Sequence, residues 1–170
     1  MNDTTGVADV HASLVAALPR LRRFARTLAR NAHDADDLVQ VAVERALSRI
    51  DQWRPGTSLL SWLFGIVRNA WLDEARARRR RLRLFTSDEN GERVSDPGAQ
   101  SNEQRVAIDA AMARLPDEQR LVVGLVLVDG LSYKEAAEVL QVPIGTVTSR
   151  LARARATLIE LLGDAAETAS

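Results

Sequence analysis

The chain has 170 residues, of which 46% are hydrophobic, enough for one large or two small globular cores. Its 23 basic and 23 acidic residues give a net charge of zero, so affinity for nucleic acid must come from the distribution of charge. The absence of cysteine excludes disulfides, thiolate metal sites and redox sensing by this chain. Because no apolar run is long enough to span a bilayer and no signal-peptide core is present, we expect a cytoplasmic protein.

Two helices are predicted near the start of the chain. Residues 10–30 place apolar side chains at a helical period, and Pro19 is expected to kink or split this segment. Residues 34–50 form the second helix, whose acidic first turn complements the helix dipole. Its expected buried face consists of Leu38, Val39, Ala42, Val43, Ala46 and Ile50.

The opposite face of this second helix is acidic and rich in amides. It contains Asp37, Gln40, Val41, Glu44 and Ser48. Such a surface repels phosphate, so it fits a protein-docking face or, equally well, an ordinary solvated face.

A loop over residues 51–58, rich in turn residues, precedes a third helix predicted over residues 59–81, with Thr57 or Ser58 available as its cap. The first half of this helix is apolar, and Trp62 is expected to lie in the core. Its end is a basic run made of Arg76, Arg78, Arg79, Arg80, Arg81 and Arg83. Aromatic residues beside such a run could hold unstacked bases while the arginines neutralise phosphate. The alternative is a solvated helix end whose arginines complement the dipole.

Residues 86–102 lack periodicity and are dense in Ser, Asp, Asn, Gly and Pro, which predicts a linker between two domains. Beyond it, one helix is expected to end at Leu115, and Pro116 opens another that reaches Val128. The run LVVGLVLV has a strand-like composition, but its place between a Pro-Asp-Glu start and a Gly stop favours a helix. The sequence therefore predicts an all-α fold of two small helical domains.

The pattern of a helix-turn-helix occupies residues 132–155. Ser132 and Glu135 predict a capping box at the first helix, and Pro143 lies near the first turn of the second. The buried stripe expected on the second helix consists of Val147, Leu151, Ala154 and Leu158. Its other face carries small, hydroxyl and arginine side chains, which suit a helix in the major groove of DNA. A solvated amphipathic helix is the alternative.

Three segments carry a resemblance to a known family. The second conserved domain of the sigma-70 class is similar to NAHDADDLVQVAVERAL and to RPGTSLLSWLFGIVRNAWLDEARARRRR. The fourth is similar to LPDEQRLVVGLVLVDGLSYKEAAEVLQVPIGTVTSRLARAR. With a short linker and no third domain between them, this order resembles that of the extracytoplasmic-function (ECF) sigma factors. The resemblance implies a second-domain-like unit at residues 10–84, a linker at 85–102 and a fourth-domain-like unit at 103–163.

The same resemblance implies which residues carry each contact. Core RNA polymerase would bind Asp36, Asp37, Gln40, Val41 and Glu44, where Val41 replaces an acidic residue common in the family. The −10 promoter element would be opened and held by Trp53, Arg54, Ser58, Arg68, Asn69, Arg76, Arg78, Arg79 and Arg80. The −35 element would be contacted by Thr146, Thr148, Ser149, Arg150, Ala152, Arg153 and Arg155. Thr148 stands where many members have a basic residue.

The implied partners are core RNA polymerase, promoter DNA and an anti-sigma factor, with no small-molecule substrate and no insertion into the membrane. Two alternatives are a conventional helix-turn-helix regulator that binds DNA as a dimer, and a sigma-like mimic that sequesters an anti-sigma factor. We expect no enzymatic activity, cofactor or metal, because the sequence contains no catalytic carboxylate pair, nucleophile with base, phosphate loop or metal-ligand spacing.

Overall fold

The structure, a computed structural model, describes the backbone of residues 3–84 and 101–168 and the side chains of residues 10–84 and 104–163. Within these residues there are seven α-helices and no strand, which confirms the expected all-α fold. The chain divides into two compact units, Met1–Glu89 and Asn90–Ser170. Most of the predicted linker lies outside the described residues, but its last two residues, 101–102, already belong to a helix.

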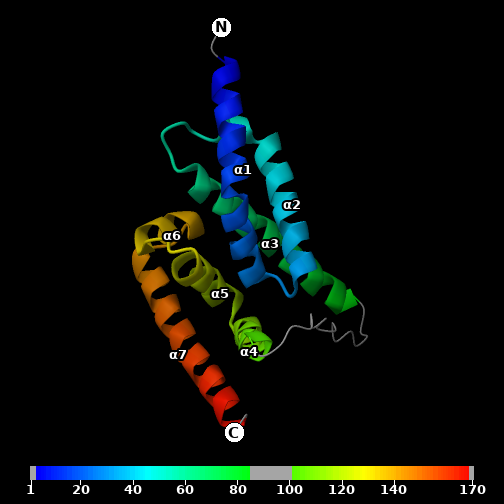
Figure 1. Cartoon of the computed structure of the whole chain (residues 1–170), viewed down its shortest axis with the longest axis vertical. Coiled ribbons are helices and arrows are strands. Elements are labelled where there is room, and N and C mark those ends of the chain that lie inside the picture. Colours follow the sequence, from blue (N-terminus) through cyan, green and yellow to red (C-terminus); the bar gives the residue numbers. More distant parts are fainter. Residues whose placement is uncertain (1–2, 85–100, 169–170) are drawn as a thin grey trace. The chain divides into compact units, whose positions relative to one another are not determined.

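Three α-helices build the first unit, and each of them packs against the other two (Figure 1). The elements are α1 (Asp3–Leu28), α2 (Ala32–Ser48), a 3₁₀ turn η1 (Ile50–Gln52) and α3 (Leu59–Leu84). Phe24 of α1 and Phe64 of α3 are fully buried, and their rings meet edge to face with centroids 5.2 Å apart. Edge-to-face packing is a favoured aromatic geometry, so this pair stabilises the contact between α1 and α3.

Helix α1 is continuous from Asp3 to Leu28, so of the two expected effects, a kink or a split, Pro19 does not cause the split. Proline removes one hydrogen-bond donor from a helix interior and crowds the preceding turn. Pro19 is exposed, and water can therefore bind the carbonyl group that lacks its donor. On the opposite side, buried residues before and after Pro19, such as Leu14, Leu21 and Phe24, hold both halves of the helix to the core.

Helix α2 begins earlier than predicted, at Ala32, because Asn31 caps it. The Asn31 Oδ1 atom accepts a hydrogen bond of 2.8 Å from the backbone N–H of Asp34. The expected core face is confirmed for four of its six members, Leu38, Val39, Ala42 and Ala46, whereas Val43 and Ile50 are only half-buried. On α3, Trp62 is also half-buried, and the fully packed tryptophan is Trp71.

The second unit consists of two short helices and the helix-turn-helix, coloured from yellow-green to red in Figure 1. Its elements are α4 (Ser101–Arg114), α5 (Asp117–Val123), η2 (Gly124–Val128), α6 (Tyr133–Leu140) and α7 (Ile144–Thr168). Helix α7 packs against α4, α5 and α6 and is therefore the centre of this unit. In α4, Ala111 and Met112 are buried, whereas Val106 and Ile108 are exposed.

The strand-like run LVVGLVLV is helical, as predicted, but it changes type at Gly124. From Gly124 to Val128 the backbone forms a π-turn, in which the N–H of Asp129 donates to the Gly124 carbonyl at 3.0 Å. The glycine and the neighbouring valines are poor helix formers, which favours a departure from α geometry here. The wider turn buries Leu125 and leaves Leu127 and Val128 exposed.

Arg120 of α5 closes the end of α4. Its guanidinium donates hydrogen bonds to the carbonyl oxygens of Met112 at 3.0 Å, Ala113 at 2.9 Å and Leu115 at 3.0 Å. The last carbonyl groups of a helix have no hydrogen-bond donor within the helix. A cation at this end also interacts favourably with the negative end of the helix dipole. Arg120 is thus a capping residue supplied by the next helix.

We expect Arg120→Met to lower the free energy of unfolding of the second unit by about 2–3 kcal/mol, because three acceptors lose a charged donor. Chemical denaturation followed by far-ultraviolet circular dichroism measures the change. Arg105→Met is the matched control, since Arg105 lies exposed on α4. Equal stability of the two variants would contradict the capping role.

Candidate nucleic-acid interface and docking face

The acidic face of α2 is open to solvent over two turns. Asp36, Asp37, Gln40 and Glu44 are exposed, and Val41 is 40% exposed among them. Their mutual contacts are weak: His33 lies 3.4 Å from Asp37, and the Gln40 amide donates to Glu44 at 3.2 Å. Both contacts lie at the surface, where water competes with them. The face is therefore folded, accessible and free to change partners.

The loop before α3 is held by hydrogen bonds to its own backbone. The backbone N–H and the hydroxyl of Thr57 both donate to the Arg54 carbonyl, at 3.1 and 2.7 Å. Ser58 caps α3, because its Oγ accepts from the backbone N–H of Ser61 at 3.1 Å. The Trp53 ring is half-buried, and its indole N–H is buried without an acceptor among the described residues. Trp53 can thus gain a hydrogen bond by moving.

Arg68 and Asn69 form a pair on α3. The Arg68 Nε and Nη2 atoms both donate to the Asn69 Oδ1, at 3.0 and 2.7 Å. Because Oδ1 is engaged, the Asn69 side chain, which is exposed, presents its amide N–H groups as donors. Burial lowers the pKa of the Arg68 guanidinium from its usual value, since the cation is partly removed from water.

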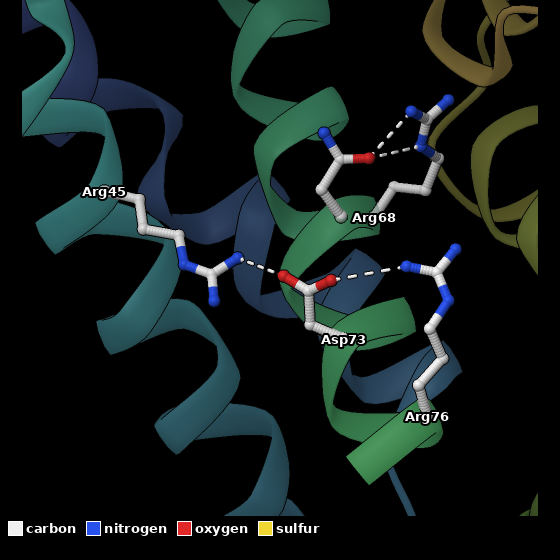
Figure 2. A network of polar contacts seen from close by, with 5 residues as sticks. Arg45, Arg68, Asp73 and Arg76 are labelled. Carbon is white, nitrogen blue, oxygen red and sulfur yellow. Dashed lines mark hydrogen bonds and ion pairs between the residues drawn. The ribbon is translucent and has the colours of Figure 1, made fainter.

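The basic run at the end of α3 divides into groups with different partners. Arg76 contacts Asp73 at 3.4 Å, as Figure 2 shows, and the same carboxylate contacts Arg45 of α2 at 2.8 Å. Arg78 and Arg81 both contact Glu74, at 3.7 and 3.0 Å. The other arginines of the run, Arg79, Arg80 and Arg83, are exposed. The run contains six arginines, and the acidic residues that contact it in these pairs are Asp73 and Glu74, so the run with these two residues is net positive.

The helix-turn-helix has the predicted local structure. The Glu135 carboxylate accepts from the Ser132 N–H at 2.8 Å, and the Ser132 hydroxyl accepts from the Glu135 N–H at 3.2 Å, which confirms the capping box. Gln141 ends α6 in the left-handed conformation, with φ of 56°, a position that sequence reasoning did not single out. Of the expected stripe on α7, Val147, Leu151 and Ala154 are buried and Leu158 is half-buried.

The outer face of α7 brings together most of the residues proposed from the sequence for the −35 element. The exposed members are Thr148, Ser149, Ala152, Arg153 and Arg155. Thr146 is half-buried. The Arg150 guanidinium does not extend into solvent with the others but contacts the Glu118 carboxylate of α5 at 2.8 Å. With only 20% of its side chain exposed, Arg150 joins α7 to α5 and differs in this from Arg153.

Among the described residues, no group of His, Cys, Asp or Glu side chains could hold a metal ion. Nor is any helix that the structure describes both long and apolar enough to cross a membrane.

The two units match two regions of one class of transcription factors. Residues 14–81 match the family described as Sigma-70 region 2, and residues 105–158 match Sigma-70, region 4. The chain is 40% identical over 149 residues to the ECF RNA polymerase sigma factor EcfG of Rhodopseudomonas palustris, covering 88% of this chain and 82% of that one. It is 42% identical to the ECF RNA polymerase sigma factor SigM of Mycobacterium tuberculosis, over 85% of this chain and 72% of that one. The chain belongs to the ECF RNA polymerase sigma factors.

Solved structures agree with this assignment. The sigma factor RpoE of Bartonella quintana, in complex with the anti-sigma factor NepR, is similar with a TM-score of 0.78 and 31% identity, over 91% of this chain and 97% of that chain. CnrH in complex with the cytosolic domain of CnrY is similar with a TM-score of 0.64 and 25% identity, over 96% and 91% of the two chains. The family resemblance expected from the sequence is thus confirmed.

Proposed function

We propose that this chain is an alternative sigma factor that binds core RNA polymerase and directs it to a class of promoters. The observation that carries the proposal is the presence, in one chain, of both the region 2 and the region 4 match. A factor with both regions can contact two promoter elements while the polymerase performs the chemistry. We therefore propose no enzymatic activity for the chain itself, and we place it in the cytoplasm, where the polymerase acts.

Each surface receives one role in this proposal. The α2 face formed by Asp36, Asp37, Gln40, Val41 and Glu44 docks on core polymerase. The loop and helix that contain Trp53, Arg54, Arg68 and Asn69 handle the −10 element, and the basic run of α3 adds phosphate contacts. The outer face of α7 contacts the −35 element in the major groove. Ser58 supports these contacts as the cap of α3.

Run-off transcription tests the proposal. Purified core polymerase is incubated with fragmented genomic DNA of the source organism, with and without the chain, and transcript 5′ ends are mapped. New start sites that share two spaced upstream elements are expected. A conventional regulator would instead bind DNA without polymerase, and a sigma-like mimic would yield no starts and bind neither core polymerase nor promoter DNA.

An anti-sigma factor is the proposed regulator. The similar RpoE and CnrH structures each contain a sigma factor bound to such a protein, NepR and CnrY respectively. By analogy, a partner of this chain would cover the α2 face or the α7 face and so prevent assembly with polymerase or DNA. Co-purification of the chain from uninduced cells, followed by identification of the bound protein, tests this.

Arg150 and Arg153 of α7 should differ in their effect on promoter recognition. Arg153→Ala is expected to reduce discrimination at one −35 base pair by about 1–3 kcal/mol, because an exposed guanidinium can contact a guanine edge through two hydrogen bonds. Arg150→Ala should leave base preference unchanged and cost at most about 1 kcal/mol of stability, since Arg150 is paired with a largely exposed Glu118.

Initiation rates on promoters that carry each single −35 substitution measure both effects. A changed base preference in Arg150→Ala, with an unchanged one in Arg153→Ala, would reverse the assignment of the two residues.

A further inference from the structure

A polar hollow of about 470 Å³ lies between the C-terminal part of α2 and the middle of α3. Four arginines line it, Arg45, Arg49, Arg68 and Arg76, and Asp73 is the single acidic residue among its lining residues. Four cations against one anion leave three positive charges in excess around the hollow. Such an excess in a concave surface attracts anions, because low-dielectric walls focus the field.

The carboxylate of Asp73 is already engaged on both sides. Its Oδ2 lies 2.8 Å from Arg45 and its Oδ1 lies 3.4 Å from Arg76, and Figure 2 shows the two arginines reaching it from opposite sides. Arg49, at the end of α2, is exposed and has no hydrogen bond or ion pair through its side chain with the residues that the structure describes. Asp73 therefore joins α2 to α3 without neutralising Arg49.

The remaining lining groups also favour an anion. Asn69 holds its Oδ1 against Arg68, so the part of its amide that is left for a ligand is the N–H₂ donor. Arg68 is partly removed from water, which lowers its pKa and makes a nearby negative charge favourable. Guanidinium groups match phosphate oxygens through paired hydrogen bonds, and one phosphate has enough acceptors to bridge donors from two helices.

We propose that this hollow is a phosphate-binding site in which Arg49, the C-cap residue of α2, and Arg76 of α3 hold one phosphate group, with the Asn69 amide as a further donor. The proposal rests on the proposed function for the source of the phosphate, which would be a backbone phosphate of the promoter strand opened by the first unit. It extends the DNA-binding surface to Arg49, a residue of the polymerase-docking helix. A single phosphate would then touch both the docking helix and the promoter-opening helix.

The test removes single charges from the strand and from the protein together. Core polymerase is assembled with the full chain on a promoter fork whose −10 strand carries one neutral methylphosphonate at a time. The wild-type complex is expected to lose about tenfold in affinity at one or two positions, and Arg49→Gln should be insensitive at those positions. The slope of log affinity against log salt should also become shallower by about 0.7 for Arg49→Gln.

Arg22→Gln is the matched control, because Arg22 is exposed on α1 and does not line the hollow. It removes one charge and should keep the wild-type methylphosphonate pattern. An alternative role for Arg49, complementing the negative end of the α2 dipole, predicts lower stability of Arg49→Gln with an unchanged pattern, and this result would overturn the proposal.

A second arm distinguishes strand phosphate from a soluble phosphate compound. Pyrophosphate is titrated into the free chain, wild type and Arg49→Gln, by calorimetry. If only this arm depends on Arg49, the hollow is a site for a soluble phosphate compound; if neither arm does, the site is refuted. A wild-type chain that forms no promoter complex would refute the proposed function, while the titration would still decide whether the hollow binds phosphate.

Discussion

Phe64→Ala is expected to lower the free energy of unfolding of the first unit by about 3–5 kcal/mol. Phe64 is fully buried between α1 and α3, where it meets the edge of the Phe24 ring, and the Arg20 guanidinium lies 5.7 Å from its centroid. Alanine would leave a cavity and would also remove the aromatic pair and the contact with the cation. A loss of this size is a large part of the stability of a small domain.

Tryptophan fluorescence measures this loss without interference from the second unit. All three tryptophans of the chain, Trp53, Trp62 and Trp71, lie in the first unit. Leu82→Ala is the control, because Leu82 is 54% exposed on α3 and should cost well under 1 kcal/mol. If Phe64→Ala and Leu82→Ala unfold at the same denaturant concentration, Phe64 is not the centre of the core.

Asp37→Lys is expected to reduce initiation by the polymerase about 30- to 100-fold. Reversing a charge in a docking surface places like charges opposite each other and costs several kcal/mol, of which about 2–3 kcal/mol gives this factor. Because the Asp37 side chain is 61% exposed and its contact with His33 is at the surface, the fold should not change. The effect should therefore appear as weaker binding to core polymerase at normal stability.

Competition for core polymerase against a labelled wild-type chain gives the affinity, and run-off transcription gives the rate. Asp109→Lys on α4 is the matched control, since it makes the same charge change at an exposed position outside the docking face. Equal losses in the two variants would indicate a general charge effect and would remove the argument for the α2 face.

The parts of the fold that were predictable from the sequence are those determined by near neighbours. The capping box at Ser132, the buried stripe of α7 and the open face of α2 depend on residues three or four positions apart. Such spacings can be read directly in a single sequence. The two sigma regions were also recognisable, because their motifs occur together and in order.

The contacts that sequence reasoning missed join residues far apart in the chain. Arg150, predicted from the sequence to contact DNA, forms an ion pair with Glu118, and Arg45 forms one with Asp73 of another helix. Arg120 of α5, beyond Pro116, donates hydrogen bonds to carbonyl groups at the end of α4. No local pattern marks which of many arginines will find such partners. Pro19 does not split α1 for a similar reason, since packing of the whole unit outweighs the local cost of the proline.

The outer face of α7, proposed above to contact the −35 element, has a consequence for the entropy of binding. The hydroxyls of Thr148 and Ser149 donate to the backbone of their own helix, at 3.1 Å each, and Arg150 is held by Glu118. These contacts favour one rotamer of each side chain, which reduces the entropy lost when the chain binds DNA. Arg153 and Arg155 are exposed and long, and each would lose about 1–2 kcal/mol of rotamer freedom on binding. If this face contacts the −35 element as proposed, the entropic cost of side-chain ordering would fall mainly on these two arginines.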